Sequence, residues 1–266
     1  MKTTAYIVNA FTESIASGNP AGVVLLDDDI EDELMQKIAV DIGKSETAFI
    51  RFLGNNEFQI RWFSPIREVK LCGHASLAAA KVINNQKHFN KIKFHYLEGI
   101  FEVSIGIDGY ISLSFPLDKY EILGNDDRYE KFFGNLPIIE CIKGIKTGKV
   151  IIIVDSMFDL REIKPNFEFM KNESGIFENG IGISKRSNKY DIESRYFNPW
   201  YGVNEDPVTG SVYTVLASYW YDKIGICNIS AYQTSNRPGE LLLEVQKEKV
   251  QITGKARIVF EGSLLI

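Results

Sequence analysis

Two side chains near the start of the chain have the chemistry to move a proton, Glu46 and His74. Glu46 begins an apolar, strand-like segment, where desolvation at the edge of a cleft would raise its pKa toward the range that a general acid or base needs. His74 follows Gly73 in a turn, so its imidazole can reach a substrate or a nearby carbonyl. Position alone favours a surface role for Glu46, as a residue that caps the strand.

A thiol close to this histidine offers a second chemistry. Cys72 could act as a nucleophile or base paired with His74, but residues two apart at a turn seldom point at each other. A buried, inert thiol is therefore expected. The three cysteines are odd in number and never form CxxC, and the three histidines show no HExxH pattern, so we expect neither a disulfide framework nor a metal site.

Composition narrows the choice of partners. The 266 residues include 30 basic and 35 acidic side chains, with a formal net charge of -5, and no basic run that would track a phosphate backbone. Nucleic acid is therefore not an expected partner. No stretch approaches the roughly 18 apolar residues of a membrane helix, and the first residues lack a signal-peptide pattern. We expect a cytoplasmic protein without membrane contact.

The elements that must position these side chains indicate an α+β chain. Apolar runs at 5–11 and 22–26 flank a loop that ends in Gly18, Asn19 and Pro20. Isoleucine and leucine recur every four residues over 30–42, behind acidic residues, which predicts an amphipathic helix ending at Gly43. Further strands are predicted at 47–52, 58–63, 93–96, 101–107, 110–115 and 150–154.

A weak internal repeat suggests that the chain is doubled. Arg61-Trp62-Phe63-Ser64-Pro65 resembles Arg195-Tyr196-Phe197-Asn198-Pro199, at an offset of 134 residues against a half-length of 133. Each copy is followed by a glycine-containing turn and an apolar segment, 73–80 and 210–217. A helix that is apolar nearly all round is buried, so each half is expected to wrap strands around one central helix.

The starts of these two helices are candidate anion sites. Unpaired N–H groups and the positive end of a helix dipole favour a carboxylate there, and Gly73 and Gly210 would let the backbone approach it closely. The alternative is that each glycine only eases entry into its helix. Asp206 precedes Pro207 and has the form of an N-cap with proline at the first helical position.

Four segments resemble the PhzF-like phenazine-biosynthesis family: GNPAGVV at 18–24, SETAF at 45–49, EVKLCGHASLA at 68–78 and EDPVTGS at 205–211, with 233–239 as a fifth. The resemblance implies a diaminopimelate epimerase-like fold of two pseudo-symmetric halves, with the active site between them and usually a homodimer. The halves are expected at 1–117, joined by the last strand at about 256–266, and at 118–255.

The resemblance also implies site residues and a reaction. Glu46 matches the family's catalytic acid/base, while residues matching the substrate-binding set are Gly18, Asn19, Pro20, Gly73, His74, Asp206, Gly210 and Ser211. The family's characterised reaction isomerises a dihydro-hydroxyanthranilate without any cofactor, so the expected substrate is a small carboxylate. Next to the EDPVTGS motif at 205–211, this chain has the bulky residues Trp200, Tyr201, Val212 and Tyr213. The identity of the substrate therefore stays open.

Two other functions remain open from the residues. A racemase or epimerase of the same fold would use two facing cysteines, and Cys72 occupies the first position. No thiol stands near Asp206 at the second, so that mechanism is incomplete. The protein could also be a non-catalytic member of the family that binds a small carboxylate.

Overall fold

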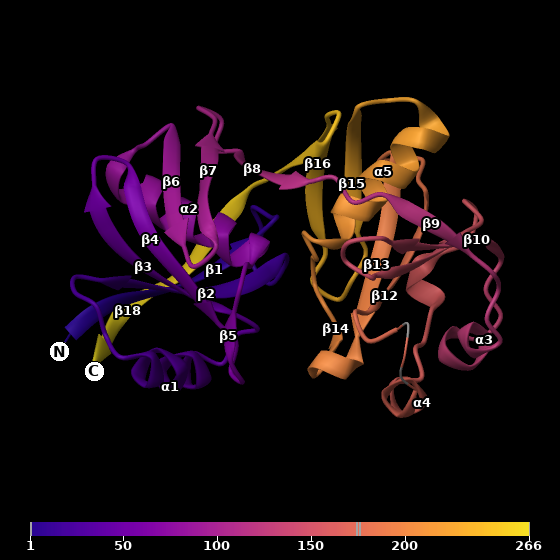
Figure 1. Ribbon diagram of the computed structural model, residues 1–266, viewed down its shortest axis with the longest axis horizontal. Helices are drawn as coiled ribbons and strands as arrows, with labels where there is room; N and C mark the ends of the chain where they lie inside the picture. The colour runs from indigo at the N-terminus through magenta and orange to yellow at the C-terminus, as the bar shows by residue number, and fades with distance from the viewer. Residues whose placement is uncertain (1, 174, 176, 266) are drawn as a thin grey trace. The chain divides into compact units, whose positions relative to one another are not determined.

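The computed structural model describes residues 2–173, 175 and 177–265 and divides the chain into two compact units (Figure 1). Unit 1 comprises Met1–Ser114 and Thr253–Ile266, and unit 2 comprises Phe115–Ile252. The chain therefore enters unit 2 within one strand, β8, and leaves it within another, β17. The last strand, β18, returns to unit 1 and pairs antiparallel with β1.

Unit 1 carries a long helix enclosed by strands and a second helix outside them. Its elements are β1 (Lys2–Ala10), β2 (Asn19–Leu26), α1 (Asp32–Ile42), β3 (Thr47–Gly54), β4 (Glu57–Phe63), β5 (Glu68–Val69), α2 (Gly73–Lys87), β6 (Lys91–Tyr96), β7 (Gly99–Ile105), β8 (Ile111–Pro116) and β18 (Ala256–Leu265).

Unit 2 has the same kind of core with additional short helices. Its elements are β9 (Tyr120–Leu123), α3 (Arg128–Phe133), β10 (Ile138–Gly144), β11 (Val150–Val154), η1 (Leu160–Glu162), α4 (Phe167–Asn172), β12 (Ile181–Arg186), β13 (Ile192–Asn198), η2 (Pro199–Tyr201), β14 (Val203–Glu205), α5 (Val212–Ile224), β15 (Asn228–Gln233), β16 (Gly239–Val245) and β17 (Lys249–Gly254).

The strand pairing is the same in both units. In unit 1, β1 pairs antiparallel with β2, β2 parallel with β3, β3 antiparallel with β4, β4 parallel with β6 and β6 antiparallel with β7. In unit 2, β10, β11, β12, β13, β15 and β16 repeat this order and these directions. The predicted α+β class and the internal duplication are confirmed.

Each unit has one central helix. In unit 1, α2 contacts β18, β1, β2, β3 and β7, which are spread across the sheet. Its side chains from His74 to Ala80 are all buried, and in unit 2 so are those of α5 from Val212 to Trp220. The prediction of two buried helices is therefore confirmed, because neither helix needs a polar face.

The two central helices fill their sheets with different side chains. Four alanines make α2 narrow, whereas α5 carries Tyr213 and Trp220. These large residues also meet polar partners: Tyr213 Oη lies 2.8 Å from Ser194 Oγ, and Trp220 Nε1 donates to Ser184 Oγ at 3.0 Å. Bonding inside the sheet offsets the cost of burying a hydroxyl and an indole N–H.

Helices also cover the outer face of each sheet. In unit 1, Met35, Ile38 and Ala39 of α1 pack on apolar residues of β2, β3 and β4. The helix ends at Gly43, as predicted, and Gly43 has a left-handed conformation. In unit 2, aromatic residues of α3 and Met170 of α4 pack on β10 to β13. The outer layers therefore hold the sheets that position the candidate site.

The opening hairpin differs from the prediction in one respect. Asn19 and Pro20, predicted to end the loop, already belong to β2, where they lie opposite Ala10 and Asn9 of β1. Gly18 is the turn residue: its φ is +68°, and a Cβ there would collide with the carbonyl of Ala10.

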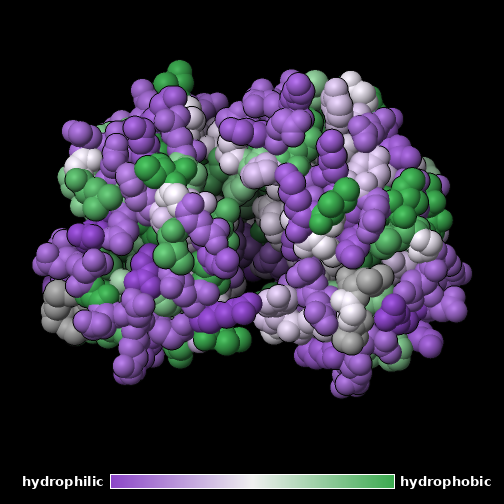
Figure 2. Space-filling model, in the orientation of Figure 1, coloured by the Kyte–Doolittle hydropathy of each residue, from purple (hydrophilic) through white to green (hydrophobic). Residues whose placement is uncertain are grey.

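The visible surface has no dominant apolar face. Hydrophilic residues predominate in both units in Figure 2, with apolar residues in small groups between them. Within the part of the chain that the structure describes, no helix is long and apolar enough to cross a membrane.

Candidate active site

Glu46 is held in place at the junction between α1 and β3. Its carbonyl accepts the N–H of Gly22 on the neighbouring strand at 3.0 Å. The strands approach closely here, since a Cβ at Gly22 would lie 2.6 Å from Thr47 Oγ1 and 2.8 Å from Ile42 Cγ2. The backbone that presents the carboxyl is therefore fixed on both sides.

The Glu46 carboxyl is mostly removed from water. Its side chain is 22% exposed, and Oε2 lies 3.3 Å from His74 Nε2. Burial raises the pKa of Glu46, and hydrogen bonds with Ser45 and Cys72 act in the opposite direction. A carboxyl with a raised pKa in a desolvated position suits a general acid/base. The surface position that its sequence context favoured is wrong.

Cys72 and His74 reach this carboxyl from the start of α2. Cys72 Sγ lies 3.5 Å from His74 Nδ1, and Ser45 Oγ lies 3.4 Å from Nε2. The expectation that the thiol and the imidazole would point apart is wrong, because Cys72 is still extended (φ -135°, ψ 111°) while His74 is already helical. Buried as expected, the thiol is nevertheless part of the cluster.

These three side chains could also share a metal ion. One donor atom from each of Glu46, Cys72 and His74 lies within 4.8 Å of the other two. Local spacing in the sequence does not predict this grouping, because Glu46 comes from a different element than Cys72 and His74. Hydrogen bonds at both ring nitrogens of His74 account for the same closeness without an ion.

The remaining predicted site residues of unit 1 lie at the start of α2 (Gly73) or in the hairpin between β1 and β2 (Gly18, Asn19 and Pro20). Gly73 is the first residue of α2, whose first turn contains no acidic side chain, so the helix start keeps its positive character. Asn19 is fully buried within β2. Whether Gly18, Asn19 and Pro20 contact a substrate stays a prediction.

The predicted site residues of unit 2 belong to a hydrogen-bonded turn just before α5 or to the start of that helix. Asp206 accepts a 2.5 Å hydrogen bond from the Thr209 hydroxyl. Gln233, fully buried, accepts the N–H of Thr209 at 2.9 Å and donates to the carbonyl of Asp206 at 2.7 Å. The prediction that Asp206 caps the helix is wrong: α5 begins at Val212, and Ser211 is its N-cap residue.

Asp206 does not cap α5 because the turn between them is too long. Asp206 caps its own turn through Thr209, three residues on, and Pro207 lies outside the helix. Gly210 accepts the N–H of Tyr213 at 3.2 Å, so both Gly210 and Ser211 stand at the start of α5, as their motif predicts. Their contact with a substrate stays a prediction.

Lys149 was missed by the sequence analysis. Its ammonium donates to Tyr196 Oη at 2.6 Å and to the carbonyl of Asn179 at 3.3 Å. Burial lowers the pKa of Lys149 to about 8, and the charge of Asp206 opposes this shift. A lysine before an apolar strand carries no sequence signal of its own, since most such lysines are solvated.

Comparisons with known proteins agree on one family. The family model described as phenazine biosynthesis-like protein matches residues 8–262. An uncharacterized isomerase of Pseudomonas aeruginosa is 36% identical over 266 residues, covering 99% of each chain. A phenazine biosynthesis-like domain-containing protein of Homo sapiens is 35% identical over 290 residues, again covering 99% of each.

Solved structures give the same result for the fold. A PhzF-family phenazine biosynthesis protein of Enterococcus faecalis has a TM-score of 0.93 at 32% identity and covers 100% of both chains. A hydroxyproline epimerase of Agrobacterium vitis has a TM-score of 0.62 at 8% identity, covers 99% of this chain and 92% of its own, and shares the fold alone. The chain belongs to the family of phenazine biosynthesis-like (PhzF) proteins and has the diaminopimelate epimerase-like fold that its motifs predict.

Proposed function

We propose that the protein is a cofactor-independent isomerase that moves a proton within a small carboxylate, with Glu46 as the general acid/base. The observation that carries the proposal is the Glu46 carboxyl, desolvated, raised in pKa and 3.3 Å from His74. Relatives named as isomerases support the reaction class. The expected substrate is cyclic, with an amino or hydroxy group beside the carboxylate.

The reaction needs one proton and no change of oxidation state. Ionised Glu46 removes a proton from a substrate carbon, so a C–H bond breaks and an O–H bond forms while the electron pair enters the conjugated system. The double bonds shift, and the Glu46 carboxyl returns the proton at another carbon. The start of α2 at Gly73 would stabilise the negative charge that develops between the two transfers.

His74 and Cys72 would orient the carboxylate. A neutral imidazole with its proton on Nε2 donates toward Glu46, which favours the ionised form that starts the reaction, and Cys72 lies at the other ring nitrogen. The polar groups of the substrate would be bound by residues of the family motifs: Asp206, Gly210, Ser211 and Gly18 to Pro20.

The test is hydrogen exchange in D2O. Purified protein is incubated with a panel of small cyclic and acyclic amino or hydroxy carboxylates, dihydro-hydroxyanthranilate among them, and carbon-bound hydrogen is followed by NMR. The variant Glu46→Gln should lose exchange by roughly 10²-fold or more, as expected for a general acid/base. Glu57→Gln is the matched control, because Glu57 pairs with His95 at 2.8 Å at a half-exposed position of the same unit, away from the Glu46 cluster.

Two outcomes would contradict the proposal. If the wild type binds carboxylates but exchanges none of their hydrogens, the protein is a binding member of the family. If Glu46→Gln stays active and alkylation of Cys72 stops exchange, the thiol is the base and an epimerase mechanism replaces the one proposed.

A further inference from the structure

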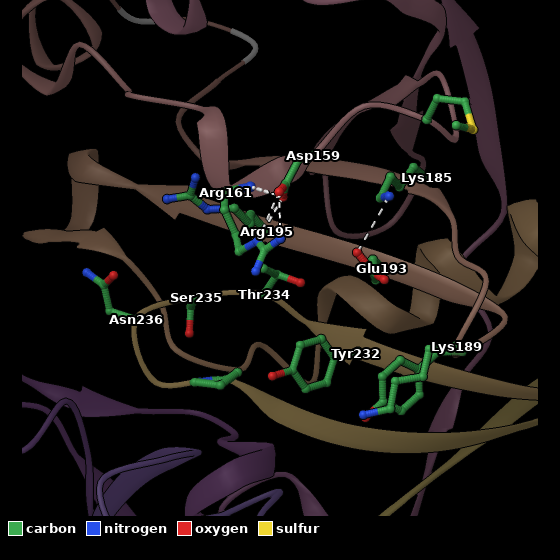
Figure 3. A pocket seen from close by; sticks show the side chains of 13 residues that line it. Asp159, Arg161, Lys185, Lys189, Glu193, Arg195, Tyr232, Thr234, Ser235 and Asn236 are labelled. Carbon is green, nitrogen blue, oxygen red and sulfur yellow. Dashed lines mark hydrogen bonds and ion pairs between the residues drawn. The ribbon is translucent and has the colours of Figure 1, made fainter.

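Unit 2 contains a pocket that none of the predicted site residues line. Its volume is about 720 Å³, within the range of small-molecule sites. Side chains of three neighbouring strands contribute to it, Lys185 from β12, Glu193 from β13 and Tyr232 from β15 (Figure 3). The short helix η1 adds Arg161, and the turns after β12 and β15 add Lys189 and Asn236, among others.

Lys185 is an incompletely paired cation on the sheet side of this pocket. Its side chain is 12% exposed, and its ammonium donates to the carbonyl of Ser156 at 3.0 Å. The nearest carboxylate oxygen, Glu193 Oε2, is 3.7 Å away, and Glu193 also accepts the Ser187 hydroxyl at 2.5 Å. An ammonium has three donors, so Lys185 keeps hydrogen-bonding capacity for a ligand.

The balance of charge in the pocket is positive. Four cations and two carboxylates line it. Arg195 is neutralised from outside the lining by Glu205 at 2.7 Å, and Arg161 pairs with Asp159 at 2.7 Å. Lys189 has no ion pair among the described residues, and its ammonium lies 5.0 Å from the centre of the Tyr190 ring. An anion would complete this arrangement.

Tyr232 gives the pocket a flat wall. Its ring stacks on Tyr190 at 4.9 Å with an interplanar angle of 3°, and the Tyr190 hydroxyl is fixed by a 2.5 Å bond to Glu240. Burial raises the pKa of Tyr232, so the phenol stays protonated and can donate. Figure 3 shows this ring on one side of the open space and Lys185 and Glu193 on the other.

A hydroxyl beside this wall also lacks a partner. Thr234 lines the pocket, and its Oγ1 is buried and has no hydrogen-bond partner among the residues that the structure describes. A buried hydroxyl without a partner costs free energy.

We propose that this pocket is a second binding site that takes a small aromatic carboxylate, with the carboxylate near Lys185 and the ring against Tyr232, while Lys189 adds positive charge on the Tyr232 side. A phosphate group shares the oxyanion chemistry but not the planar ring, so the two can be distinguished. The proposal does not depend on the isomerase function, because its residues are not those of the Glu46 cluster.

The test is a titration of the ¹⁵N-labelled protein with benzoate, acetate and inorganic phosphate in separate experiments. Benzoate should shift amide signals of β12, β13 and β15 saturably and bind at least about tenfold more tightly than acetate, because only benzoate can use the Tyr232 wall. Lys185→Met should weaken benzoate roughly tenfold, since it removes a charge-assisted hydrogen bond. Exposed Lys164→Met is the control and should leave binding unchanged.

Further variants keep the proposal falsifiable. Lys189 is exposed, so Lys189→Met tests the anion site even if Lys185→Met folds poorly. Shifts at pocket residues without shifts at Glu46, His74 or Asp206 would show that the signal does not come from the isomerase site. Phosphate binding more tightly than benzoate would overturn the aromatic ligand, and the absence of saturable shifts, or equal binding by all lysine variants, would overturn the site.

Discussion

β3 in unit 1 and β12 in unit 2 are equivalent strands, and each pairs in parallel with the strand before it. The residue before β3 is Glu46, and the residue before β12 is Gly180. The strand registers make the two positions equivalent, because Thr47 lies opposite Phe63 in one unit and Ile181 lies opposite Phe197 in the other. In each unit, the carbonyl of this residue accepts an N–H from the neighbouring strand, at 3.0 Å in unit 1 and 3.3 Å in unit 2.

The buried ionisable side chains at these two places carry charges of opposite sign. A side chain at Gly180 would collide with the Tyr196 hydroxyl, and that hydroxyl binds the ammonium of Lys149. Unit 1 thus keeps a desolvated acid and unit 2 a desolvated base. The duplicated scaffold fixes where a charge is held out of water, whereas individual side chains decide its sign.

A second feature has kept both its chemistry and its geometry. Arg61 forms two hydrogen bonds to Glu68 on the paired strand, at 2.7 and 2.9 Å, and Arg195 forms two to Glu205 at the same distances. Burial separates them: the Arg61 side chain is 22% exposed and that of Arg195 is 10% exposed. Arg195 also donates to the carbonyls of Leu160 and Ile163.

The largest effect is therefore expected at Arg195. Arg195→Met leaves a nearly buried Glu205 and two carbonyls without their partner, and should lower the free energy of unfolding by about 3 to 5 kcal/mol. Arg61→Met should cost about 1 kcal/mol or less, because water can reach its partners. Urea denaturation of both variants measures the difference, and equal losses would show that the two copies are energetically alike.

This duplicated frame was largely predictable from the sequence. Two R-x-F-x-P segments and two apolar helices determine it, because periodicity and burial follow from local patterns. The contacts that make the site were less predictable. The pairing of Cys72 with His74 depends on the backbone angles of one residue, and the role of Lys149 depends on a tyrosine 47 residues away. Such contacts follow from tertiary packing and leave no trace in spacing.

Replacing Lys149, the buried lysine of unit 2, with an uncharged side chain should stabilise the protein. The folded chain releases the Lys149 proton near pH 8, whereas the unfolded chain holds it to about 10.5, so the unfolded state binds more protons between these values. Stability should therefore rise with pH across this range in the wild type. Lys149→Met should be about 1 to 2 kcal/mol more stable at pH 7, with the gain shrinking toward pH 10.

Thermal denaturation at pH 7 and 9.5 measures this effect. The control is Lys146→Met on the same turn, whose side chain is exposed. A destabilised Lys149→Met variant would mean that the bond to Tyr196 contributes more than burial of the charge costs, and the contrast between the two units would lose its energetic basis.

The smallest effect is expected from Glu46, with the opposite pH dependence. Because burial raises the pKa of Glu46, the folded chain binds its proton more tightly than the unfolded chain, and stability falls as the pH rises through the two pKa values. Glu46→Gln lacks this loss and should be about 1 kcal/mol more stable at pH 7, with the difference narrowing toward pH 4.

Glu57→Gln should change in the other direction, because the His95 hydrogen bond lowers the pKa of Glu57 and so stabilises the ionised form at neutral pH. Chemical denaturation at pH 4, 5.5 and 7 compares the two variants. Stability changes of opposite sign in the two variants would show that the difference in burial sets the direction of each pKa shift, since both glutamates lie next to a histidine. A Glu46→Gln variant that is less stable than the wild type at pH 7 would instead mean that the bonds to His74, Ser45 and Cys72 outweigh desolvation, and Glu46 would then be held as a structural carboxylate.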